Sequence, residues 1–163
     1  MAVKRVSINW NAKLNDSKDL PKYGDSGDGK FSKKFGDGRF VIPAPLEVDA
    51  LMKKVPKGKL TTINELRTAL ARKHKTDFTC PITTGIFSWI AAFAADELAQ
   101  QGHKRITQYW RTLKSDGQIN PKYPGGIEAI REKLEAEGHT VIQKGKRFLV
   151  ENFEKKTIVP KQG

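Results

Sequence analysis

The sequence holds a single cysteine, Cys80, among its 163 residues. One thiol can form no disulfide within its own chain and no thiolate metal site. The histidines His74, His103 and His139 also lack the spacing of metal ligands. We therefore expect no metal and no cofactor, and a reducing, cytoplasmic compartment.

Long apolar runs are missing as well. The most apolar stretch is Gly85–Ala95, which at 11 residues is too short to cross a bilayer. The opening residues contain no apolar run of the kind that a secretory signal carries. The sequence thus predicts a protein with no membrane partner.

Acidic residues are few relative to basic ones. The chain has 30 Lys and Arg against 18 Asp and Glu, a formal net charge of +12. Such a surplus attracts polyanions, because each neutralised phosphate releases condensed counterions. The charge favours a nucleic acid as the partner, although a merely soluble basic protein would also fit. We expect a monomer whose partner is double-stranded DNA.

Residues 1–40 differ in composition from the rest of the chain. A phrase of Gly-Asp-Gly, a basic residue and Phe occurs at 27–31 and again at 36–40. Asp-Gly steps form turns readily, so short hairpins packed on the domain and a flexible basic arm both remain open. The anchors of such hairpins would be Phe31, Phe35 and Phe40. We predict a basic, Gly-rich, partly ordered extension over 1–40 and a DNA-binding domain over 41–163.

Hydrophobic periodicity predicts helices over residues 45–55, 62–75, 83–100 and 126–137. Alternation predicts a short strand at 106–110 and a hairpin over 140–150. The two middle helices flank a turn, which is typical of a helix-turn-helix. We expect a mainly α fold with small β elements (α+β), namely a winged-helix-like helix-turn-helix domain with a short C-terminal β-hairpin.

The helix ends and inward faces can also be predicted. Thr61 or Thr62 would cap the second helix, with Glu65 at capping-box spacing. Thr83 or Thr84 would cap the third helix, and Gly102 would end it. The inward residues of the first helix would be Leu46, Val48, Leu51, Met52 and Val55. Those of the third would be Ile86, Ile90, Phe93, Ala94 and Leu98.

Four segments resemble the O6-alkylguanine-DNA alkyltransferase family in the order in which that family has them. Val55–Leu66 resembles the family's Ile-Pro-x-Gly-x-Val-x-Thr-Tyr-Gly-Glu-Leu, and Thr83–Ala92 falls where the family has its recognition helix. Tyr109–Ile119 resembles the active-site segment, Cys-His-Arg followed by Ser-Asp-Gly. Tyr123–Gly138 resembles the closing loop and helix. The resemblance covers about residues 46–138 and implies a DNA-binding domain.

The departures from the family pattern fall on its chemistry. Tyr109 stands at the position of the nucleophilic Cys, Trp110 at that of the activating His, and Gln108 at that of the Pro. A phenol with an ordinary pKa near 10 is a poor nucleophile without a base. The family's phosphate-contacting Tyr falls at Ile63, and its arginine finger falls at about Thr84. The resemblance is therefore to alkyltransferase-like proteins, which bind O6-alkylguanine in DNA without transferring the alkyl group.

The resemblance places a pocket for a flipped base at the aromatic cluster. Its residues would be Tyr109, Trp110, Arg111 and Tyr123. An ordinary structural role is the alternative: the rings would pack in the core, and Arg111 would pair with a buried carboxylate.

The DNA contacts expected with this pocket come from two groups. The residues of the helix-turn-helix would be Thr62, Thr83, Thr84 and Ser88. The phosphate contacts would come from Lys53, Lys54, Lys57, Lys59, Arg67, Lys104 and Lys114.

Two other functions stay open at this stage. A winged-helix module with no preference for damaged DNA would direct Lys144, Lys146 and Arg147 of the hairpin toward a backbone. An active alkyltransferase would need Cys80 as its acceptor, although a buried structural thiol is the stronger interpretation of that residue.

Overall fold

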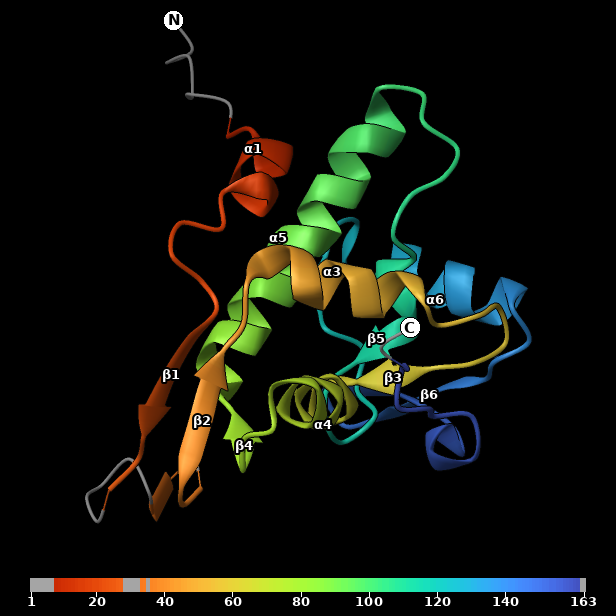
Figure 1. Cartoon of the computed structure of the whole chain (residues 1–163). Helices are drawn as coiled ribbons and strands as arrows, with labels where there is room; N and C mark the ends of the chain where they lie inside the picture. Colours follow the sequence, from red (N-terminus) through yellow and green to blue (C-terminus); the bar gives the residue numbers. More distant parts are fainter. Residues whose placement is uncertain (1–7, 28–32, 35, 162–163) are drawn as a thin grey trace, which may run out of the picture.

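The computed structural model describes residues 8–27, 33–34 and 36–161. Its helices surround the long helix α5, and its strands form three small sheets (Figure 1). The helices are α1 (Trp10–Asn15), α3 (Pro45–Lys53), α4 (Ile63–His74), α5 (Pro81–Gln100) and α6 (Gly126–Ala136), with 3-10 turns η1 (Tyr109–Arg111) and η2 (Phe153–Lys155). The strands are β1 (Lys22–Asp25), β2 (Arg39–Ile42), β3 (Thr61–Thr62), β4 (Phe78–Thr79), β5 (Thr112–Leu113), β6 (Val141–Lys144) and β7 (Arg147–Val150). The fold is α+β, as predicted.

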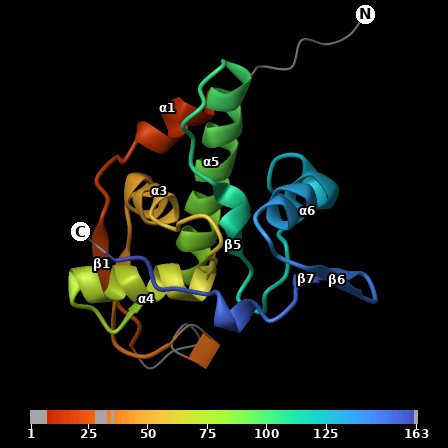
Figure 2. The ribbon, with the colours of Figure 1, turned by 90° about the vertical axis from the view of Figure 1, so that its right-hand side faces the viewer.

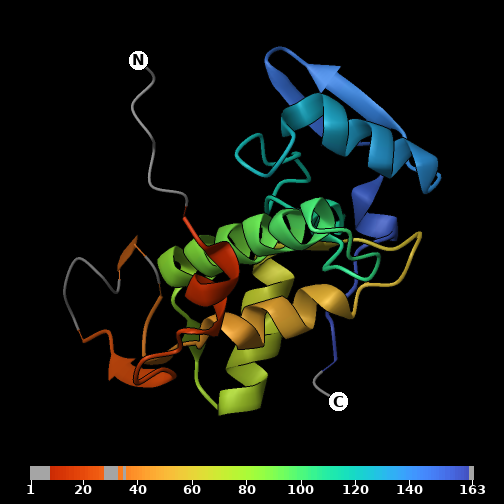
Figure 3. The same cartoon turned by 90° about the horizontal axis from the view of Figure 1, so that it is seen from above.

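Helix α5 packs against α1 and α3 (Figure 3). Its buried residues are Thr84, Ser88, Ala91, Ala92, Ala94 and Ala95. The predicted inward position of Ile86 is wrong, because this side chain is 47% exposed. Small side chains allow close approach between helices, so this face of small residues is buried, while Ile82 and Ile86 remain exposed.

The predicted inward face of α3 is correct apart from its first residue. Val48, Leu51, Met52 and Val55 are buried, whereas Leu46 in the first turn is exposed. Helix α5 begins at Pro81 rather than at residue 83, and its N-cap is Cys80 rather than the predicted Thr83 or Thr84. Proline suits this first helical position, since its missing N–H would have no partner there.

Helix α4 begins as its sequence predicts. The Thr62 hydroxyl accepts a hydrogen bond from the Asn64 N–H and donates one to the Glu65 carboxylate. The preceding strand β3 pairs in parallel with β5, with Thr62 opposite Leu113. The start of α4 therefore lies beside Lys114, the residue that follows β5.

The strand predicted at 106–110 is wrong. Residues 104–108 form no regular element, and Tyr109–Arg111 form the 3-10 turn η1. Only the next two residues enter a strand, because only they meet a partner, β3. An alternating sequence forms a strand only where a second backbone lies beside it, and the sequence pattern does not reveal that partner.

The C-terminal elements were predicted correctly. Helix α6 buries Ile130 and Leu134, and β6 and β7 form an antiparallel hairpin. Gly145 supplies the positive φ, 63°, that its turn requires. Figure 2 shows α6 and this hairpin on the opposite side of α5 from α4.

The N-terminal region contributes a strand pair to the domain. β1 pairs with β2, and β2 pairs in parallel with β4. The Tyr23 hydroxyl lies 2.9 Å from His74 Nδ1, and His74 Nε2 lies 2.7 Å from the Glu47 carboxylate. Of the predicted anchors, Phe40 packs on Phe78, while Phe31 and Phe35 fall outside the described residues. The division of the chain at residue 40 stays a prediction.

Candidate nucleic-acid interface

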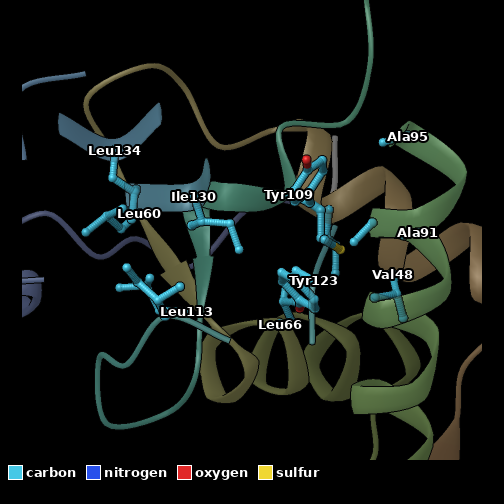
Figure 4. Close-up of a cluster of buried hydrophobic side chains, with 14 of the residues drawn as sticks. Val48, Leu60, Leu66, Ala91, Ala95, Tyr109, Leu113, Tyr123, Ile130 and Leu134 are labelled. Atoms are coloured by element: carbon cyan, nitrogen blue, oxygen red, sulfur yellow. The ribbon is translucent and has the colours of Figure 1, made fainter. Parts of the chain in front are cut away.

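The aromatic cluster of η1 lies largely inside the protein. Tyr109 is 3% exposed and packs edge-on against Trp110 and Tyr123. Figure 4 shows Tyr109 and Tyr123 between α5 and the apolar residues under α6. Burial, with the nearby Asp96 charge, raises the pKa of Tyr109 to about 12. The phenol is therefore neutral at physiological pH and poorly suited to nucleophilic attack.

Arg111 has a structural partner, as the alternative interpretation held. Its Nε and Nη2 donate to the Glu137 carboxylate at 2.9 and 2.6 Å, and its Nη1 donates to the Val55 carbonyl at 2.7 Å. Burial would raise the pKa of Glu137, but the hydrogen bonds and charge of Arg111 hold it below its usual 4.5. Trp110 lies half-buried beside this pair, with the Lys133 ammonium 4.8 Å from its ring centroid.

The hydroxyl residues predicted to contact DNA form hydrogen bonds within the protein. Thr84 and Thr83 donate to the Cys80 carbonyl, at 2.7 and 3.4 Å. Ser88 donates to the Gly85 carbonyl at 2.8 Å and accepts from Tyr123 at 3.1 Å. Thr62 caps α4. Thr62, Thr84 and Ser88 are buried, so these three hydroxyls build the fold rather than its surface.

The outward face of α5 is apolar. Ile82 and Ile86 are 52% and 47% exposed, and they line a groove of about 650 Å³ with Trp89. Its opposite wall is the loop carrying Asn120 and Lys122. The Trp89 indole N–H donates to the Lys122 carbonyl at 3.2 Å, which ties this loop to the helix.

Sequence reasoning missed this groove, although a signal was present. Ile82, Ile86, Trp89 and Phe93 recur at i, i+4, i+7 and i+11, as one helical face. That stripe is as regular as the alanine stripe, and hydrophobicity alone favoured the larger residues as the buried ones. At one end of the stripe, Trp10 of α1 covers Trp89 and Phe93. The centroid of its ring lies 4.9 Å from the ring centroid of each.

The predicted lysine contacts are exposed and widely spread, whereas Arg67 is half-buried. Lys57 and Lys59 precede β3, while Lys114 follows its partner β5, so they lie at opposite ends of this strand pair. Lys104 lies beyond the C-terminal end of α5, roughly 30 Å from the helix start at 1.5 Å per residue. Their contact with DNA stays a prediction.

Cys80 is buried at 6% exposure, as the sequence favoured. Within the described part of the chain, no three His, Cys, Asp or Glu side chains gather where they could hold a metal ion. Among the same residues, no helix has both the length and the apolar character needed to span a membrane.

These features define a basic α+β protein in which the second of two adjacent helices exposes an apolar face. The sequence matches no protein-family profile and no curated protein. Among solved structures, the fold is similar to the crystal structure of S. pombe Atl1 in complex with damaged DNA containing O6-carboxymethylguanine. The match has 20% sequence identity and a TM-score of 0.49, and covers 71% of this chain and 94% of that one. The function proposed below is therefore argued from the residues of this chain.

Proposed function

We propose that the protein binds double-stranded DNA without modifying it, using the outward face of α5. The observation that supports this most directly is the exposed pair Ile82 and Ile86 at the start of a helix, in a chain of charge +12. Exposed apolar patches with a polar rim mark interaction surfaces. The cationic surplus selects a polyanion as the partner.

Apolar side chains are suited to contact bases. Proteins that enter the minor groove often insert Ile, Leu or Phe between base steps and open the duplex. Gly85 lies between the two isoleucines, and a Cβ built there would meet no other atom within 4 Å. The middle of this face is therefore open to close approach by a strand, with Lys122 at its rim.

The environment of η1 supports the proposal that the protein transfers no alkyl group. The position that resembles the alkyl acceptor holds the buried, neutral phenol of Tyr109. Its neighbour Trp110 offers no basic nitrogen that could take a proton. A protein with this site would hold DNA but accept no alkyl group.

We further propose that an O6-alkylated guanine, turned out of the duplex, occupies the groove beside α5. The side chains of Tyr109 and Tyr123 are buried, and neither lines this groove. The groove provides an indole, Trp89, for the ring and the alkyl group, and an amide, Asn120, for the base edge. Tyr123 would support the site from behind through its hydrogen bond to Ser88.

Competitive binding to duplexes with and without one O6-methylguanine, at two salt concentrations, tests both parts. We expect salt-sensitive binding that tightens on the alkylated duplex. Equal affinity for the two duplexes would reject damage recognition and leave DNA binding. No binding to either duplex at low salt would reject the whole proposal.

The Ile86→Asp variant tests the surface itself. A carboxylate on this face would meet phosphates, so we expect at least about a 10-fold loss of affinity. Leu46→Asp is the matched control, since Leu46 is 42% exposed on α3 and the change of charge is identical. Equal losses in the two variants would show that charge alone, and not the α5 face, governs binding.

A damage-blind winged-helix module is the second candidate. Lys144, Lys146 and Arg147 are exposed at the tip of the β6–β7 hairpin, where a wing would meet a phosphate backbone. This candidate is favoured if replacing these three cations weakens binding while Ile86→Asp does not.

A further inference from the structure

A second groove lies along the outer side of α4, between this helix and segment 76–79. Its volume is about 560 Å³, and Asn64, Arg67, Arg72 and Lys75 line it from the helix. None of these residues lines the apolar groove beside α5. Figure 1 shows α4 and β4 side by side at the lower edge of the molecule, with α5 rising from the end of β4.

Arg67 is held in this groove by its backbone and by one side-chain nitrogen. Its Nε donates to the Thr79 carbonyl at 2.9 Å, and the Thr79 hydroxyl donates to the Arg67 carbonyl at 2.7 Å. The hydrogen bond made by Nε fixes the plane of the guanidinium. Within the described part of the chain neither terminal nitrogen forms a hydrogen bond, so both could form the two-pronged contact that arginine makes with a phosphate.

The Arg67 guanidinium is half-buried. Among the described residues, no carboxylate lies within ion-pair distance of it. Burial lowers the pKa of Arg67, because the guanidinium is partly removed from water. Partly burying an unpaired cation costs free energy, and a bound anion would recover it.

Two exposed cations extend the groove toward the end of α4. Arg72 and Lys75 follow Arg67 by five and eight residues and line the same groove. The helix dipole also stabilises cations near the C-terminal end of a helix, and this effect alone would explain why Arg72 and Lys75 occur there. It does not explain Arg67, which lies in the second turn of the helix.

The carboxylate that lines this groove is already engaged elsewhere. Asp77 accepts a hydrogen bond from the Arg39 N–H at 2.8 Å, on the side of the β1–β2 strands. The Asp77 carboxylate would repel an anion only at that end of the groove. The cations lie on the opposite side, which α4 forms.

We propose that this groove is a phosphate-binding site, with Arg67 as the fixed fork and Arg72 and Lys75 as the outer contacts. The source of the phosphate rests on the proposed function. If α5 contacts DNA, the ligand of this groove is the neighbouring sugar-phosphate backbone of the same duplex. Thr79 in the groove precedes the first residue of α5 by two positions, so both surfaces meet one duplex. In helix-turn-helix proteins the first helix crosses the backbone in this way.

The test on DNA uses the double variant Arg72→Ala with Lys75→Ala, whose side chains are exposed. Losing two phosphate contacts reduces the slope of log K against log salt by about 1.8 and the affinity near physiological salt by about 10-fold or more. The control removes Arg131 and Lys13, one Arg and one Lys on α6 and α1, and so changes the net charge equally. Equal slopes in the variant and the control would overturn the backbone contact.

A second measurement does not depend on DNA. Inorganic phosphate at constant ionic strength should raise the Tm of the wild-type protein, and Arg67→Lys should lose most of that shift although it keeps the charge. No phosphate-dependent shift, together with an unchanged salt slope in the double variant, would reject the site. A phosphate shift without any DNA binding would reject the proposed function and keep the site, assigning it to a free phosphate or phosphomonoester.

Discussion

The Arg111 guanidinium and the Glu137 carboxylate form a buried ion pair, with 2.6 Å between Nη2 and Oε2. Their side chains are 9% and 8% exposed. The pair joins η1 to the C-cap of α6, and the third bond of Arg111, to the Val55 carbonyl, adds the loop after α3. Arg111 therefore holds three segments of the chain together.

Replacing Glu137 with Gln should destabilise the protein strongly, because Arg111 would stay buried without a counter-charge. Breaking a buried pair by removing one partner costs about 3–5 kcal/mol, and the amide would recover part of that. The free energy of unfolding in urea measures the loss. Glu135→Gln is the control, since the Arg131–Glu135 pair is exposed and is worth less than about 1 kcal/mol. Similar losses in both variants would contradict the structural role of Arg111.

Acid should destabilise the protein in two successive steps. Burial lowers the pKa of His139 below its usual 6.5. The Glu137 carboxylate raises it in part, whereas the charges of Lys156 and Arg111 lower it further. The unfolded chain then binds this proton first, so stability falls as the pH drops below about 6.5. Glu137, with its pKa lowered from 4.5, adds a loss only as the pH falls below about 4.5.

Urea midpoints at pH 7.5, 6.5 and 5.5 separate the first step from the second. His139→Gln should flatten the decline over this range, whatever its effect on absolute stability. His103→Gln, a change at an exposed histidine, should keep the wild-type decline. A decline of the same steepness in the His139 variant would assign the acid sensitivity to other groups.

The elements that could be predicted from the sequence depend on local signals. The cap at Thr62, the turn at Gly145 and the periodicity of α6 each act within a few residues. No distant contact is needed to make them favourable. For that reason they appear where the sequence places them.

The parts that failed depend on neighbours far along the chain. Helix α5 carries a stripe of small residues, which is buried, and the stripe of Ile82, Ile86, Trp89 and Phe93, of which α1 covers only the last two. Ile86 was placed inside on hydrophobicity alone, and the apolar groove was missed with it. Arg67 was predicted as one phosphate contact among several cations, but the hydrogen bond to Thr79 that fixes its guanidinium could not be predicted. Candidate sites of this kind are defined by tertiary contacts, which periodicity does not encode.

Tyr109 should matter for packing and not for its hydroxyl. Within the described residues, no group forms a hydrogen bond with that hydroxyl, so Tyr109→Phe should change the free energy of unfolding by less than about 0.5 kcal/mol. Tyr109→Ala should cost about 3–5 kcal/mol, because it leaves a cavity among buried rings. DNA affinity, measured well below the unfolding temperature, should be the same for wild type and Tyr109→Phe. A selective loss of binding to alkylated duplex in that variant would place the phenol at the ligand.

Cys80 should accept no alkyl group from DNA. Its thiol is 6% exposed and lies in the N-cap residue of α5, followed by Pro81. A donor base would have to displace the first turn of the helix to reach the sulfur. After incubation with a duplex containing O6-methylguanine, intact-protein mass spectrometry should show no gain of a methyl group. Cys80→Ala should bind the same duplex with wild-type affinity, which separates a structural thiol from one at the interface. A methylated Cys80 peptide would instead make the protein an alkyl acceptor and would remove the argument that its chemistry is absent.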